Sequence, residues 1–107
     1  YKDALELAKV TSNLDIMSNI FTKTAVTFKN AGENKKALNN FKSAAMLAER
    51  AGNSQNLVTV YEQAGDLMRD MDFSKRAADL YKKSYRMAEK SNDKSALIRL
   101  REKLLTK

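Results

Sequence analysis

The sequence matches itself when it is shifted by 40 residues, and this internal repeat restricts the fold more than any other feature. The aligned pairs are Ala37 with Ala77, Phe41 with Tyr81, Leu47 with Met87, Ala48 with Ala88, Glu49 with Glu89, Leu57 with Leu97, Val58 with Ile98, Ala4 with Ala44, Leu7 with Leu47, Ala8 with Ala48, Phe21 with Tyr61 and Phe28 with Met68. Turn signals recur at Ser12-Asn13, Gly52-Asn53 and Asn92-Asp93. Such units are expected to stack, because one unit alone cannot bury its apolar face.

Each unit is expected to contain two helices. The chain has no proline and only three glycines, so few residues interrupt a helix, and apolar residues recur at helical spacing within each segment. The predicted helices cover residues 2–11, 14–31, 34–51, 54–71, 74–91 and 94–105. Gly32 and Gly52 can adopt the left-handed conformation that ends a helix. The predicted N-caps are Asn34, either Asn53 or Ser54, and Ser74.

These helices divide a single all-α domain into two complete units and two halves. The complete units are residues 13–52 and 53–92, and the halves are residues 1–12 and 93–107. Because the first residue is Tyr1 rather than Met and each end carries an unpaired helix, we expect the chain to be a piece of a longer protein. The unpaired terminal helices would expose apolar faces that neighbouring units normally cover, which favours self-association.

The second helix of each unit alternates small and large residues. The series are Ala37, Phe41 and Ala44 in one unit and Ala77, Tyr81 and Ser84 in the next. Helices that pack closely need small residues where their backbones approach, and a large residue then fills the remaining gap. We therefore expect these positions, and most of the aromatic residues, to form the core.

This arrangement resembles the tetratricopeptide repeat family, whose first helix carries Leu-Gly-x-x-Tyr and whose second helix carries Ala-x-x-x-Phe. The corresponding segments here are Thr24-Ala25-x-x-Phe28 followed by Ala37-x-x-x-Phe41, and Ala64-Gly65-x-x-Met68 followed by Ala77-x-x-x-Tyr81. The resemblance covers nearly the whole chain and implies a right-handed superhelical α-solenoid of antiparallel helix pairs. The sequence departs from the family in its period of 40 rather than 34 residues and in lacking the early Trp and the closing Pro.

The longer period is similar to that of the extended-helix variants found in SNAP-type membrane-fusion adaptors and in signalling scaffolds. Helix pairs of the HEAT family have a similar period and are an alternative. Both families predict stacked helix pairs, so the sequence leaves the subfamily open and not the architecture.

The resemblance implies a protein–protein interaction module that binds a partner peptide or helix on a concave surface, lined mainly by the first helix of each unit. The expected contact residues are Asn19, Lys23, Glu62, Asp66, Arg69 and Asp70, and the last helix would add Arg99 and Lys103. Glu62, Asp66 and Asp70 are spaced four residues apart, which places three like charges on one helical face. This stripe predicts either a groove for a basic or amide-rich peptide or an ordinary solvated face.

The formal charge of +7 lies entirely within residues 75–107, because acids and bases balance in residues 1–74. Six of these cations fall on one predicted helix and form a basic patch. They are Lys75, Arg76, Lys82, Lys83, Arg86 and Lys90. The patch is either a solvated face or a contact for an acidic protein or an anionic membrane surface. Nucleic acid is the least favoured partner, because no nucleic-acid-binding motif accompanies the charge.

The sequence contains no cysteine and no histidine. Disulfides and Cys- or His-ligated metals are thereby excluded, and the commonest general base is absent. No glycine-rich phosphate loop is present either, so we expect a binding protein that is not an enzyme and uses no cofactor or metal. No apolar run approaches the ~18 residues needed to span a bilayer, and no signal-peptide pattern opens the chain. We therefore expect an intracellular, cytoplasmic protein.

Overall fold

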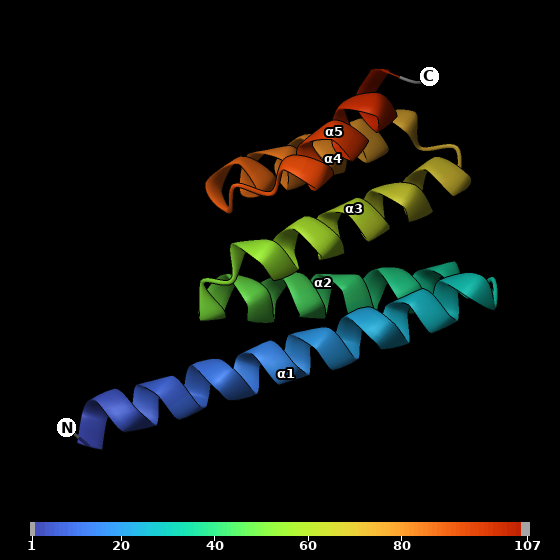
Figure 1. Ribbon diagram of the computed structural model, residues 1–107. Coiled ribbons are helices and arrows are strands. Elements are labelled where there is room, and N and C mark those ends of the chain that lie inside the picture. The colour runs from blue at the N-terminus through green and yellow to red at the C-terminus, as the bar shows by residue number, and fades with distance from the viewer. Residues whose placement is uncertain (1, 106–107) are drawn as a thin grey trace.

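The computed structural model describes residues 2–105, and the side chains of residues 12–105. This part of the chain is all-α, as predicted (Figure 1). Its helices are α1 (Lys2–Asn30), α2 (Asn34–Ala51), α3 (Ser54–Asp70), α4 (Ser74–Lys90) and α5 (Lys94–Leu105). The sequence matches at Ala4, Leu7 and Ala8 lie outside the residues whose side chains are described.

The helices pack as adjacent antiparallel pairs in two layers. α1 packs most extensively against α2, and α3 against α4, while α2 joins the two pairs through α3. Figure 1 shows α1, α3 and α5 in front, with α2 and α4 behind them. The Cα atoms extend over 51 × 30 × 18 Å, and the shortest of these dimensions fits two layers of helix. The first helices of the repeat units therefore share one layer and the second helices share the other.

Each chain reversal depends on one residue in the left-handed conformation, and these residues recur every 20 positions. They are Gly32, Gly52, Asp72 and Asn92, with φ values of 81°, 68°, 66° and 56°. All four make the paired hydrogen bonds of a Schellman motif. At Gly52, for example, its own N–H donates to the Glu49 carbonyl (3.1 Å) and the next N–H donates to the Ala48 carbonyl (3.0 Å). The prediction that Gly32 and Gly52 end helices is confirmed.

The N-caps are shared with these turns, because the residue after each left-handed residue begins the next helix. Asn53 accepts a hydrogen bond from the Asn56 N–H at 3.0 Å, and Asp93 accepts one from the Ala96 N–H at 3.1 Å. The predicted caps Asn34 and Ser74 are wrong. The N-cap positions are Glu33 and Phe73, which make no side-chain capping bond, so Asn34 and Ser74 fall one residue inside their helices.

The predicted break at Ser12-Asn13 is also wrong, since α1 runs without interruption through 29 residues. The prediction of two separate helices over residues 2–11 and 14–31 is therefore replaced by one, and residues 2–105 hold five helices rather than six. The physical reason lies in the residue at position 12. The four observed reversals use Gly, Asp or Asn, the residues that tolerate the left-handed conformation, whereas serine is penalised there.

The core follows the predicted alternation of small and large residues. Phe41 and Tyr81 are 1% and 2% exposed, and the alanines four residues before them are equally buried. The interhelical hydrogen bonds repeat as well. Ser18 on α1 donates to the Ala44 carbonyl on α2 at 2.9 Å, and Ser84 on α4 donates to the Val58 carbonyl on α3 at 2.7 Å. Since positions 18 and 44 correspond to 58 and 84, both units use the same helix crossing, with the hydroxyl on opposite helices.

Gly65 marks the closest approach of α3 to α4. A methyl group added there would lie 2.8 and 2.9 Å from two carbons of the Tyr81 ring. We expect Gly65→Ala to destabilise the fold by about 1–3 kcal/mol through overpacking. That loss would outweigh the gain of about 0.5–1 kcal/mol that alanine normally brings to a helix interior. Urea unfolding followed by circular dichroism measures the difference.

The matched control repeats Gly65→Ala in a Tyr81→Leu background. Without the ring, the methyl group no longer meets an obstacle, so the same substitution should be neutral or stabilising there. A Gly65→Ala variant that is more stable than the wild type would contradict the close packing of these two residues.

Candidate functional site

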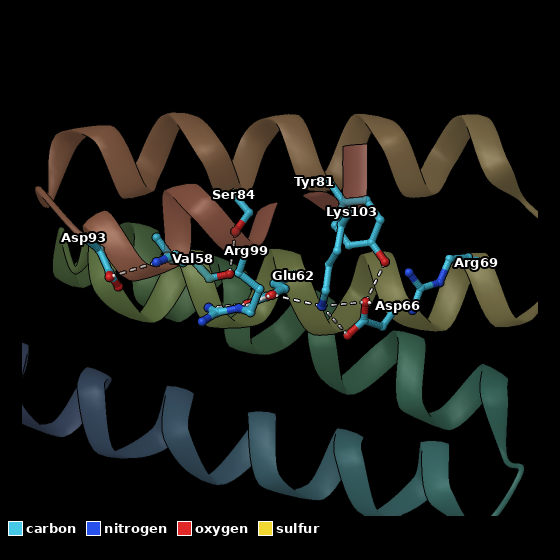
Figure 2. Close-up of polar contacts among 10 residues, drawn as sticks. Val58, Glu62, Asp66, Arg69, Tyr81, Ser84, Asp93, Arg99 and Lys103 are labelled. Carbon is cyan, nitrogen blue, oxygen red and sulfur yellow. Dashed lines mark hydrogen bonds and ion pairs between the residues drawn. The ribbon is translucent and has the colours of Figure 1, made fainter. Parts of the chain in front are cut away.

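Glu62 is the most buried charged residue of the described chain. It lies on α3, and only 7% of its side chain is exposed. Arg99 on α5 donates to both of its carboxylate oxygens, from Nε at 2.6 Å and from Nη2 at 2.7 Å. Lys103, one turn further along α5, approaches Glu62 to 2.9 Å (Figure 2). The buried carboxylate is thus paired twice, by cations that lie 37 or more residues away in sequence.

Lys103 also joins Glu62 to the neighbouring carboxylate of Asp66. Its Nζ lies 3.1 and 3.2 Å from the two oxygens of Asp66. The Tyr81 hydroxyl on α4 donates to the same carboxylate at 2.5 Å, and Figure 2 shows Lys103 reaching down between the two acids. The repulsion between like charges four residues apart on α3 is therefore offset by cations of the same chain.

The pKa values of these groups follow from that pairing. Burial on its own raises the pKa of Glu62, but the hydrogen bonds from Arg99 and Lys103 outweigh it and hold the pKa below its ordinary value. The hydrogen bond to Glu62 raises the pKa of Arg99. Burial and the hydrogen bond to Asp66 raise the pKa of Tyr81. At neutral pH the two acids and two bases are therefore all ionised, and the tyrosine is neutral.

The structure divides the predicted contact residues into two groups. Glu62 and Asp66 are turned toward α5 and are not part of an exposed stripe, which corrects the expectation that they form one. The others are exposed, with Asn19 and Lys23 on α1 and Arg69 and Asp70 at the end of α3. The sequence placed Arg99 and Lys103 on the same surface as the acids, and that proximity is observed.

All six residues of the predicted basic patch lie on α4 and are exposed. Two of them also lie over aromatic rings, Arg76 at 5.5 Å from the centre of the Phe73 ring and Lys83 at 5.9 Å from that of Tyr61. The patch therefore belongs to the layer formed by α2 and α4, on the opposite side of the molecule from the ion pairs between α3 and α5.

A groove of about 290 Å³ opens between α2 and α4, with α3 as its floor. We call it the α2–α4 groove. Its apolar residues are Leu38 and Ala45 on α2, Leu80 on α4, and Val60, Ala64 and Met68 on α3. Three cations and one acid stand around it, namely Lys42, Arg76, Lys83 and Asp79. The sequence indicated apolar residues at these positions but assigned them to the core, because the repeat pattern does not show how far α2 and α4 stand apart.

No protein-family model, curated protein or solved structure matches this chain. Within residues 2–105, no helix is long and apolar enough to cross a membrane. Across the same residues, no three acidic side chains come together in a way that could hold a metal ion. The chemistry that the described surface offers is therefore that of its ion pairs, its exposed cations and the α2–α4 groove.

We expect Glu62→Gln to lower the free energy of unfolding at neutral pH by about 1–2 kcal/mol, because a buried acceptor loses its charge-assisted bonds while Arg99 is screened by solvent. The pKa of Glu62 is lower in the folded chain, so its contribution is fully present above the ordinary value of 4.5 and is lost as the pH falls through the lowered value. The wild type should therefore lose stability more steeply in acid than the variant, as measured by urea unfolding at several pH values.

Glu33→Gln is the matched control. Glu33 is half-exposed and meets only Lys36, at 3.5 Å, so its replacement should change the stability by less than about 0.5 kcal/mol. If both variants showed the same stability at neutral pH and the same acid dependence, Glu62 would contribute no more than a surface carboxylate does.

Proposed function

We propose that this chain is a protein–protein interaction module of the tetratricopeptide-like kind that binds an acidic amphipathic helix of a partner in the α2–α4 groove. One observation carries the proposal, namely an apolar groove surrounded by three cations and a single acid. The repeat register supports the class of fold, because turn residues, buried aromatic residues and interhelical serine bonds all recur 40 residues apart. A superhelical stack with a curved binding surface is the architecture that this register favours.

The dimensions of the groove suit a helical occupant. Its lining residues extend from Leu38 to Ala45 on α2 and from Arg76 to Lys83 on α4, which is two helical turns or about 10 Å on each wall. Apolar residues at positions i, i+4 and i+7 of a helix cover about the same length. A partner helix could therefore place one apolar stripe against Leu80, Val60 and their neighbours.

The charge around the groove selects the rest of the partner. Lys42, Arg76 and Lys83 stand near the opening against Asp79 alone, so the local field is positive. Acidic residues that flank an apolar stripe would lie close to these cations, while a basic helix would be repelled. The interaction gains most of its energy from the apolar contact and its selectivity from the charges.

The layer of first helices is a weaker candidate for the partner site. The family resemblance implies a binding surface there, but the acids expected to bind a basic peptide are already paired with Arg99 and Lys103. A peptide would have to displace α5 cations from a buried carboxylate, which is unfavourable. Asn19, Lys23, Arg69 and Asp70 are the exposed residues left on that layer.

The basic patch of α4 supports a second function, the binding of an acidic protein or an anionic surface by charge alone. All six cations are exposed and lie on one helix. Binding of this kind needs no groove, so it would depend on the number of cations and weaken steeply with salt.

The test uses a labelled synthetic helix with leucine at positions i, i+4 and i+7 and glutamate elsewhere, followed by fluorescence anisotropy. Two variants of the peptide carry lysine in place of glutamate or serine in place of leucine. We expect the acidic, leucine-bearing peptide to bind at least about tenfold more tightly than either variant. Failure of the wild-type protein to distinguish these peptides would contradict the proposal.

Two double variants on the same helix then locate the site. Arg76→Glu with Lys83→Glu reverses two cations at the groove, and Lys82→Glu with Arg86→Glu reverses two exposed cations outside it. The first pair should lose peptide binding, while the second should keep most of it. Equal losses in both, together with a steep salt dependence, would assign the function to the basic patch instead.

A further inference from the structure

The first helix carries an exposed apolar face. Ile16, Met17 and Ile20 lie within two turns of α1, and they are 56%, 45% and 57% exposed. Large apolar side chains that gather in this way on a surface commonly mark a contact with another protein surface. The question is which surface fits them.

The repeat register identifies the kind of surface. Met17 and Ile20 correspond to Leu57 and Val60 on α3, 40 residues later, which are only 6% and 1% exposed. On α3 this face packs against α2, and Val60 belongs to one buried cluster with Phe41 and Ala44 of that helix. The exposed face of α1 is thus the face on which a first helix receives the second helix that precedes it.

Residues 2–11 have the sequence of such a second helix. Ala4, Leu7 and Ala8 repeat Ala44, Leu47 and Ala48 of α2 at the 40-residue spacing. In the complete unit the chain reverses at Gly52, so that α2 lies against α3. At the corresponding Ser12 the helix continues, and residues 2–11 extend away from the face that their sequence matches.

We propose that two copies of this chain exchange these segments. Residues 2–11 of each copy pack on the Met17 and Ile20 face of the other copy, while α1 stays one continuous helix in both. The two α1 helices then run antiparallel about a twofold axis near Ser12 and reproduce the contact between α2 and α3. Exchange of an identical element between copies is a low-cost route to a dimer. The exchanged dimer is independent of peptide binding in the α2–α4 groove.

The test is sedimentation equilibrium of the whole chain over a wide range of concentrations, with substitutions at residue 12. The wild type should show a concentration-dependent mass approaching that of two chains. Ser12→Gly supplies the residue that permits the reversal within one chain, so it should raise the dimer dissociation constant about tenfold or more. Ser12→Ala favours the continuous helix and should leave the dimer intact.

A second pair of variants tests the docking face. Ile20→Lys should yield a monomer, whereas Met46→Lys should not, although Met46 is similarly exposed at 52%. Both positions are at the surface, so circular dichroism should show unchanged helix content and both results stay interpretable. A wild type that is monomeric at every concentration, a dimer indifferent to Ile20→Lys, or equal behaviour of the two Ser12 variants would overturn the exchange.

Discussion

A single backbone constraint, one left-handed residue every 20 positions, organises the whole molecule. Gly32, Gly52, Asp72 and Asn92 set the length of every helix between them, so equivalent side chains of successive units meet at equivalent heights. Only then can the large residue of one helix lie opposite the small residue of the next, as Tyr81 does with Gly65. Where that residue type is missing, at Ser12, the reversal is missing too, and the consequence is an apolar face without its usual cover.

The last helix shows how a unit without its second helix is held in place. Ala96 and Leu100 of α5 are fully buried in a cluster with residues of α3 and α4. On its other side α5 brings Arg99 and Lys103 against two carboxylates of α3. Partial burial of these charges brings a desolvation penalty that limits their net contribution to stability, but it penalises any alternative placement of α5 that leaves Glu62 unpaired. The ion pairs therefore specify the position of α5, while the apolar contacts supply most of the energy.

Periodicity and the repeat register were enough to predict the helices from residue 34 onward and the buried stripe of Phe41 and Tyr81. They failed where one residue decides the outcome. Ser12 resembles a turn residue in composition but not in its tolerance of positive φ, and the caps shifted by one position because each turn uses a single left-handed residue. The pairing of Glu62 with Arg99 and the α2–α4 groove depend on distances between helices, which a one-dimensional pattern does not contain.

The distribution of charge between the two layers also decides which face attracts a partner. On the layer of first helices, cations of α5 neutralise acids of α3, so little field extends from the centre of that face. On the opposite layer the cations of α4 stand exposed beside an apolar groove. Because low-dielectric walls concentrate a field of one sign, this side of the molecule draws anionic groups toward the groove. The same arrangement that fixes α5 therefore leaves the positive charge of the chain to act on the face formed by α2 and α4.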